Sequence, residues 1–187
     1  MTERIIMAGF GGQGILFMGR VLCEAGLLEA KEVSWLPSYG PEMRGGTAHC
    51  AVVLSSAPIA SPVVTQPSAL IVMNGPSLDR FEGQVAPGGI LVVNRGMVER
   101  AVSREDVRVV EVDANAIAAE LGAGEVANVV ALGALVQATE AVSMHSVEQA
   151  LRQAIPEQRT HLLEVNLRAL HRGSEEAAGR LAAGQVG

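Results

Sequence analysis

Two glycine-rich stretches contain the residues whose types and spacing could do chemistry. The first, GFGGQG, places Gly9, Gly11 and Gly14 at the spacing of a loop that brings backbone N–H groups close to an anion. A strand-like run precedes this loop and a helix-like run follows it, so the positive end of the helix dipole would face the same anion. The stretch predicts either a site for a phosphate-bearing ligand or close packing of a strand on a helix without any ligand.

The second stretch, SYGPEMRGG, is longer than an ordinary strand connection and carries charge between its glycines. Pro41 stiffens its entry, and Gly45 and Gly46 permit positive φ or the close approach of another chain. Glu42 and Arg44 point the same way in extended backbone and could pair locally in a turn. One interpretation is a solvated turn whose charges contribute little. The other is a loop that buries Arg44 against a partner chain, where its planar guanidinium would make several bonds.

The sequence argues against an NAD site and against a metal site. NAD binding would place an acidic residue at the C-terminal end of the second strand, but that end reads WLPS, and Glu29 and Glu32 precede the strand. Cys23 and Cys50 lack CxxC spacing and are too few for an iron–sulfur cluster or a structural zinc ion. We expect both to be buried, reduced thiols. Structural or surface roles are expected for the histidines, His49, His145, His161 and His171.

Composition narrows the class of protein. In 187 residues, hydrophobic side chains make up 49% and charged ones 18%, which excludes a disordered chain and fits one domain with a sizeable core. The net charge of −6 and the lack of a Lys/Arg cluster exclude nucleic acid as an expected partner. The N-terminus is unlike a signal peptide, and VANVVALGALVQA is too short to span a bilayer. We therefore expect a cytoplasmic protein with no membrane partner.

Hydrophobic patterning predicts alternating strands and helices followed by a helical C-terminal portion. Strands are expected over residues 4–10, 32–37, 47–56, 69–74, 90–94 and 107–113. Helices are expected over 13–30, 76–85, 114–122, 125–142, 146–155 and 158–173, the second of them as a short helix or turn. The pattern predicts an α/β fold with a Rossmann-like, doubly wound sheet that is mostly parallel or mixed. We expect a single domain over residues 1–173, followed by a flexible tail over residues 174–187.

Particular residues sharpen these boundaries. Gly122 is the expected C-cap of its helix, Ser146 is the expected N-cap of the helix before Pro156, and Gly173 ends the last helix. Within the apolar helix over 125–142, a buried Asn128 must bond a neighbouring backbone group or reach an interface. Gly133 in the same helix suggests the close approach of another backbone.

Taken together, the motifs resemble the gamma subunit, or gamma domain, of 2-oxoacid:ferredoxin oxidoreductases. The matching pieces are GFGGQGI, SYGPEMRGG, PIASP, NVVALGAL and NLRALHRG, in the family order over about residues 3–173. Within the family, GPEMRGG is more similar to the 2-oxoglutarate and 2-oxoisovalerate enzymes than to the indolepyruvate type.

The resemblance implies a subunit that is inactive alone, in a complex that converts a 2-oxoacid and coenzyme A to acyl-CoA and carbon dioxide. Electrons would pass to ferredoxin, or to NAD through a flavoprotein subunit. Alpha and beta subunits and a ferredoxin-like delta subunit would hold thiamine diphosphate, Mg²⁺ and iron–sulfur clusters, so no catalytic residue is expected on this chain. The alternatives are a free-standing Rossmann-like nucleotide-binding protein and a pure scaffold subunit.

By position, the resemblance also assigns roles to individual residues. The candidates for coenzyme A contact are Gly9, Gly11, Gly12, Gln13 and Gly14. The candidates for the interface with partner subunits are Tyr39, Pro41, Glu42, Met43, Arg44, Gly45, Gly46 and Asn128. Trp35 and Tyr39 stand at the entry to the charged loop, as interface anchors or as core residues.

Overall fold

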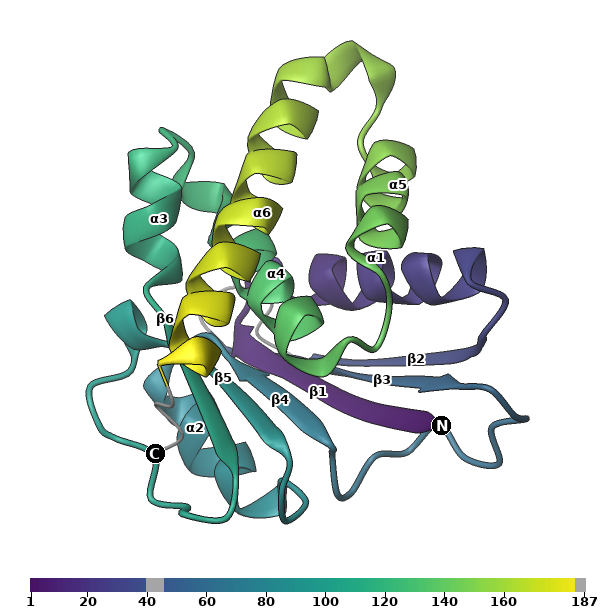
Figure 1. The fold of residues 1–187 in the computed structure, drawn as a ribbon, viewed down its shortest axis with the longest axis vertical. Coiled ribbons are helices and arrows are strands. Elements are labelled where there is room, and N and C mark those ends of the chain that lie inside the picture. Colours follow the sequence, from purple (N-terminus) through teal and green to yellow (C-terminus); the bar gives the residue numbers. More distant parts are fainter. Residues whose placement is uncertain (40–45, 184–187) are drawn as a thin grey trace.

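A six-stranded sheet forms the centre of the structure, a computed structural model that describes residues 1–39 and 46–183 (Figure 1). The strands follow the order β2-β3-β1-β4-β5-β6 across the sheet. Their bounds are β1 (Thr2–Phe10), β2 (Glu32–Tyr39), β3 (Thr47–Ser55), β4 (Ala69–Val72), β5 (Ile90–Asn94) and β6 (Arg108–Val112).

The sheet is mixed because β3 runs antiparallel to both of its neighbours. Ile6 of β1 pairs with Ala51 of β3, and Trp35 of β2 pairs with Val52 of β3. The pairs β1–β4, β4–β5 and β5–β6 are parallel. The mixed form of the expected α/β sheet is therefore confirmed, with β3 inserted between the first two strands of the chain.

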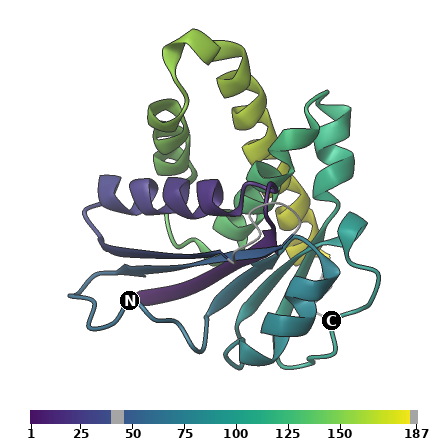
Figure 2. The ribbon, with the colours of Figure 1, turned by 180° about the vertical axis from the view of Figure 1, so that it is seen from behind.

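Helices cover the two faces of the sheet unequally (Figures 1 and 2). Most of the helices lie on one face, and α2 lies on the other. Alternation along β1 feeds both sides, since Ile5 and Met7 belong to the larger core while Ile6 and Ala8 belong to the smaller one. The helix bounds are α1 (Ile15–Leu28), α2 (Gly75–Phe81), α3 (Ala114–Glu120), α4 (Ala127–Thr139), α5 (Met144–Ala154) and α6 (Thr160–Ala182).

The helices α4 and α6 touch backbone to backbone. A Cβ built on Gly133 of α4 would collide with the Leu170 carbonyl of α6, and a Cβ built on Gly173 of α6 would collide with the Val130 carbonyl of α4. The close approach expected at Gly133 is confirmed, and Gly173 provides its counterpart. Within the described ranges 1–39 and 46–183, no helix has both the length and the apolar character needed to cross a membrane.

Two expected helix boundaries are wrong, for physical reasons. The last helix does not stop at Gly173 but continues to Ala182, because that glycine serves helix packing; residues 174–182, expected in a flexible tail, are therefore helical. The N-cap of α5 is Ser143, whose hydroxyl accepts a bond from the Ser146 N–H, so Ser146 lies inside the first turn. Gly122 follows α3 with a φ of 74°, as expected of a glycine that ends a helix.

Candidate functional site

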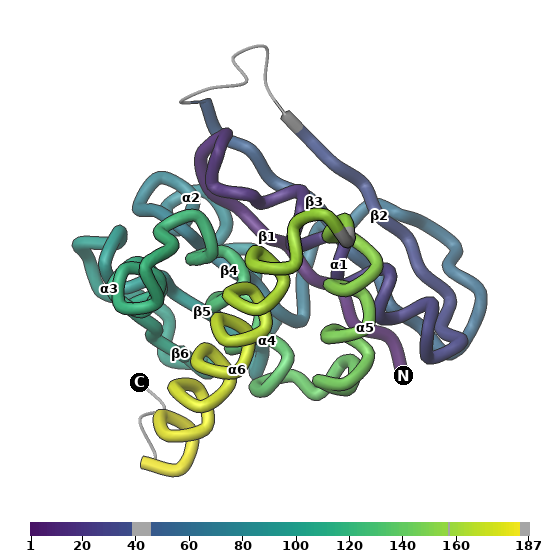
Figure 3. The backbone as a smooth tube through the Cα atoms, turned by 90° about the horizontal axis from the view of Figure 1, so that it is seen from above, coloured from purple at the N-terminus to yellow at the C-terminus, as the bar shows by residue number. Residues whose placement is uncertain are grey.

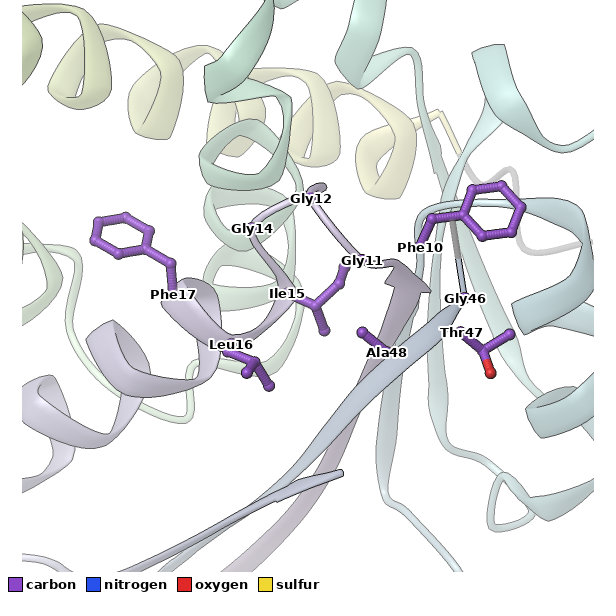
Figure 4. A pocket seen from close by; sticks show the side chains of 10 residues that line it. All are labelled: Phe10, Gly11, Gly12, Gly14, Ile15, Leu16, Phe17, Gly46, Thr47 and Ala48. Carbon is purple, nitrogen blue, oxygen red and sulfur yellow. The ribbon is translucent and has the colours of Figure 1, made fainter. Parts of the chain in front are cut away.

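A pocket of about 460 Å³ lies beside the glycine loop, at the C-terminal end of β1 (Figure 4). Open α/β sheets bind ligands at the carboxyl ends of their strands, so the location is that of a binding site. Its walls come from the loop, the first turn of α1 and the start of β3. The lining residues are Phe10, Gly11, Gly12, Gly14, Ile15, Leu16, Phe17, Gly46, Thr47 and Ala48.

The backbone of the loop adopts conformations that strongly favour glycine. Gly12 and Gly14 have φ values of 98° and 73°, in the left-handed region. A Cβ on Gly14 would collide with the amide of Asn128, and a Cβ on Gly9 would lie 2.6 Å from Oε1 of Gln13. Gly12 lines the pocket, and a Cβ at this position would meet nothing within 4 Å.

The Gln13 side chain fixes the glycine loop through three hydrogen bonds. Its Oε1 accepts bonds from the Phe10 N–H at 2.7 Å and from Nδ2 of Asn74 at 3.3 Å, while its Nε2 donates to the Met73 carbonyl at 3.4 Å. Of the expected coenzyme A contacts, Gly11, Gly12 and Gly14 line the pocket, whereas Gly9 and Gln13 do not. The role observed for Gln13 is to tie the loop to the end of β4.

Asn128 holds the loop from the opposite side. Its side chain is buried, with 5% exposed, and its Nδ2 donates to the Gly14 carbonyl at 3.2 Å. Its Oδ1 accepts from the Val129 N–H at 2.9 Å. Of the two roles expected for this amide, the structure shows the bond to a neighbouring backbone group.

The two glycine-rich stretches meet in space. The Gly11 N–H donates to the Gly46 carbonyl at 2.8 Å, and Tyr39 pairs with Ala48 in the β2–β3 ladder. Gly46 also lines the pocket. The expected interface residues Pro41, Glu42, Met43, Arg44 and Gly45 lie outside the described residues, so their interface role stays a prediction.

The groups that the pocket presents are suited to binding a ligand. Met18 is the first helical residue whose N–H finds a carbonyl, that of Gly14, and in the described part of the chain the N–H groups of Ile15, Leu16 and Phe17 have no protein acceptor. Free N–H groups at the start of a helix favour an anion. None of the residues that line the pocket in the described ranges is ionisable. The site can therefore hold a ligand that is partly apolar and partly anionic, and the lining residues that the structure describes offer no acid or base.

The cysteines and His49 do not line the pocket. Burial raises the pKa of both the Cys23 and the Cys50 thiol to about 12. His49 faces the other side of the sheet, 5.0 Å from the Phe81 ring, and burial together with the nearby Arg80 lowers its pKa. Among residues 1–39 and 46–183, no group of three or more His, Cys, Asp or Glu could hold a metal ion.

The apolar walls of the pocket were missed by the motif-based prediction. Phe10 lies within the first motif and Ile15 directly follows it, while Thr47 and Ala48 follow the second, so attention to the apolar residues in and just after each motif would have found them. Trp35, expected as an interface anchor or as a core residue, is 40% exposed; a Cβ on Gly19 of α1 would lie 2.9 Å from its Nε1, so the indole packs on that helix.

The chain resembles curated relatives over nearly all of its length. The family model described as pyruvate ferredoxin/flavodoxin oxidoreductase matches residues 4–176. The ketoisovalerate oxidoreductase subunit VorA of Methanothermobacter marburgensis is 38% identical over 182 residues, which cover 95% of this chain and 37% of VorA. The chain therefore spans little more than a third of that relative. The 2-oxoglutarate synthase subunit KorC of Methanocaldococcus jannaschii is 36% identical over 95% of both chains.

Solved structures agree with this match. The gamma subunit of a keto/oxoacid ferredoxin oxidoreductase from Geobacter sulfurreducens superposes with a TM-score of 0.85 at 29% identity, covering 96% of this chain and 98% of that one. A 2-oxoglutarate:ferredoxin oxidoreductase from Magnetococcus marinus, solved with 2-oxoglutarate, coenzyme A and succinyl-CoA bound, gives a TM-score of 0.88 at 25% identity over 95% of this chain and 31% of that one. The resemblance drawn from the motifs is confirmed: the chain belongs to the pyruvate ferredoxin/flavodoxin oxidoreductase family and matches its gamma-type subunit.

Proposed function

We propose that this chain is the gamma subunit of a multi-subunit 2-oxoacid oxidoreductase and that it supplies a wall of the coenzyme A site. The observation that carries the proposal is the match to the 2-oxoglutarate synthase subunit KorC, which is 36% identical over 95% of both chains. In the reaction, the bond between the carboxylate and the 2-oxo carbon breaks, and a thioester bond to coenzyme A forms. Carbon dioxide, a proton and an electron pair are released, and ferredoxin accepts the electrons.

The chemical steps belong to partner subunits in this proposal. The two cysteines are buried and their thiols point to the carbonyls of Ile15 and Ser34, so the described residues do not fit an iron–sulfur cluster. Thiamine diphosphate and its Mg²⁺ find no group of metal ligands in these residues either. We therefore assign thiamine diphosphate, Mg²⁺ and the clusters to alpha, beta and delta partners. In this proposal the residues of this chain take no chemical part in the reaction.

The pocket beside the glycine loop suits coenzyme A chemically. Its apolar walls match the pantetheine arm, and the free N–H groups of the first turn of α1 match the pyrophosphate. The relative from Magnetococcus marinus was solved with coenzyme A bound, which supports the assignment of this ligand. The names of the relatives support 2-oxoglutarate or a branched-chain 2-oxoacid as the substrate class.

Substitution of Gly12 tests the coenzyme A contact. Gly12→Arg should raise the coenzyme A concentration needed for half-maximal acyl-CoA formation by at least about tenfold, since the long side chain enters the pocket. Gly12→Ala is the matched control: it has the same unfavourable φ of 98° but meets nothing within 4 Å. If the two variants have the same coenzyme A dependence, the chain is a scaffold without ligand contact.

Assembly is tested separately. A tag on this chain should recover the larger thiamine-binding partners from its native source, in equal amounts for both Gly12 variants. If the isolated chain instead binds NAD tightly and reduces a substrate on its own, the gamma-subunit proposal is wrong.

A further inference from the structure

Exposed apolar side chains gather at one edge of the sheet, where α1 ends and β2 runs. Leu27 is 61% exposed and Leu36 is 41% exposed, and Leu28 and Trp35 are exposed as well. The strand order places β2 at the end of the sheet. Figure 3, in which the molecule is seen from above, shows β2 and β6 at opposite sides of the sheet and α1 beside β2. We call Leu27, Trp35 and Leu36 the α1–β2 edge surface.

The three side chains of this surface lie on both faces of the edge strand. Trp35 packs on α1, and Leu36 points to the opposite face, because successive residues of a strand alternate. Leu27 lies on the β2 side of α1: it follows Cys23 by one helical turn, and the Cys23 Sγ lies 4.0 Å from the Ser34 carbonyl of β2. A protein that packs against this edge therefore meets apolar groups on both faces of β2.

The opposite edge of the sheet is built differently. β6 exposes Arg108 and partly exposes Glu111, and α6 packs against it. Charged side chains and covering helices protect an edge strand from other chains. The eight residues of β2 instead expose Trp35 and Leu36, and an edge with exposed apolar side chains is typical of a contact with another protein. Pro37 removes one N–H from β2 and so disfavours the addition of a further strand, which assigns the contact to side chains.

The cations of α1 and of the turn that follows it are already paired within the chain. The Arg20 Nε lies 2.8 Å from the Glu24 Oε1, and the Lys31 Nζ lies 2.8 Å from the Glu29 Oε2. These side chains need no carboxylate from another protein. The contact face of the partner is therefore expected to be apolar, as in the centre of a protein–protein interface.

The coverage of the relatives indicates what this edge contacts. The match covers 37% of VorA and 31% of the chain from Magnetococcus marinus. In both relatives, the domain that corresponds to this chain shares its polypeptide with a larger remainder. Two domains of one polypeptide are held at a high effective concentration, which favours a contact between them even where the surface is small. The remainder of VorA is therefore the part of the relatives against which an apolar edge of this domain can pack.

We propose that the α1–β2 edge surface packs against the partner subunit that corresponds to the remainder of VorA, through an apolar face of that partner. The proposal rests on the proposed function, which makes this chain one subunit of a complex. Leu27 and Trp35 become buried on the α1 side of the sheet, and Leu36 becomes buried on the other. None of these three residues lines the pocket beside the glycine loop, so the contact is separate from the proposed coenzyme A contact.

Substitution of Leu36 tests the contact. A tagged Leu36→Glu chain should recover at least about tenfold less of the partner than the wild type, because a carboxylate buried in an apolar contact is costly. Leu27→Glu should have the same effect. Met97→Glu is the matched control: Met97 is also 41% exposed, but it lies after β5 on the other side of the sheet. All three changes add one negative charge at an exposed position, so urea unfolding of the isolated chains should be the same for the three variants.

Oxidative footprinting provides a second measurement that needs no substitution. Trp35 is the single tryptophan of the chain, and both it and Met97 react readily with hydroxyl radicals. Mass spectrometry compares the isolated chain with the complex recovered with it. Oxidation of Trp35 should fall at least about fivefold on assembly, because a side chain in the centre of an interface loses its contact with water. Oxidation of Met97 should stay the same.

The outcomes separate this inference from the proposed function. If the wild type recovers the partner and Leu27→Glu and Leu36→Glu recover it equally well, the surface lies outside the contact and only the inference fails. Unchanged oxidation of Trp35 in the complex has the same meaning. If the isolated wild type is a dimer that Leu36→Glu separates while the partner is still recovered, the surface joins two copies of this chain and the assignment to the partner is wrong. If the wild type itself recovers no partner, the proposed function fails as well.

Discussion

Two carboxamide side chains set the position of the glycine loop. Gln13 fastens it to the Met73 carbonyl at the end of β4, and Asn128 fastens it to α4 through the Gly14 carbonyl. The sequence identified Asn128 as a buried amide in need of partners, and the glycines as a tight loop. The partners themselves could not be predicted, because they are backbone atoms 60 and 114 residues away along the chain. A backbone carbonyl leaves no mark in the sequence, so the direction of these amides had to come from the structure.

Asn128→Asp should lower the free energy of unfolding by about 1–3 kcal/mol at neutral pH. The new side chain has the same shape but loses the donor to Gly14, and its carboxylate then faces that carbonyl. Denaturant unfolding measures the difference, which should shrink at acidic pH because a protonated carboxyl can donate again. Asn115→Asp is the control: Asn115 is exposed and only its Oδ1 is used, as acceptor from Asn94. Equal losses for the two variants would contradict the role given to Asn128.

At the level of elements, the sequence predicted which helices and strands exist better than where they end. The apolar helix α4 and the strand runs were predictable, since they depend on local patterning. The end of α6 was not predictable, because a glycine at position 173 is compatible both with a helix terminus and with a close contact between two helices. Only the structure, in which the Val130 carbonyl lies against Gly173, decides between them. The start of α5 presents the same problem. Either Ser143 or Ser146 could be its N-cap, and in the structure the N-cap is Ser143.

The glycine contact between α4 and α6 is expected to dominate the stability of the helical layer. Gly173→Ala should destabilise the protein by about 1–3 kcal/mol, because its Cβ would collide with the Val130 carbonyl and the helices must separate. Thermal or urea unfolding provides the measurement. Gly179→Ala in the same helix is the matched control, since its Cβ meets nothing within 4 Å, and it should be neutral or stabilising by up to about 1 kcal/mol. A similar loss from both substitutions would disprove the contact.

Across the whole molecule, polar ties join the N-terminal half to the helical half. Glu29, after α1, accepts a bond from the Ser143 N–H at 2.6 Å and pairs with Lys31 at 2.8 Å. Lys31 in turn donates to the Ala141 carbonyl. The turn between α1 and β2 is thereby fixed to the connection between α4 and α5. Burial acts to raise the pKa of Glu29, but the hydrogen bonds from Lys31, Ser143 and Ser146 outweigh it and lower the pKa to about 2.

This tie makes stability depend on pH in a predictable direction. Because the folded-state pKa of Glu29 lies below the unfolded value of about 4.5, its contribution is fully present above that pH and is lost as the pH falls towards about 2. Glu29→Gln should therefore reduce the free energy of unfolding by about 1–2 kcal/mol at pH 7, allowing for solvent screening. Urea unfolding of both proteins over this pH range should show the difference narrowing with acid. Glu32→Gln, at an exposed edge-strand position, is the control; a gap that stays constant with pH would contradict the assignment.

The insertion of β3 between β1 and β2 has a consequence for the order in which the chain can assemble. During synthesis, β1 and β2 emerge first, yet in the native sheet they pair with β3 and not with each other. Until residues 47–55 have been synthesised, the apolar segment Ile5–Ala8 has no strand partner, so it stays unpaired in the nascent chain. The arrival of β3 then pairs both earlier strands at once and, through the Gly11–Gly46 bond, closes the glycine loop in the same step. The binding pocket and the N-terminal part of the sheet are thus expected to form as one cooperative unit.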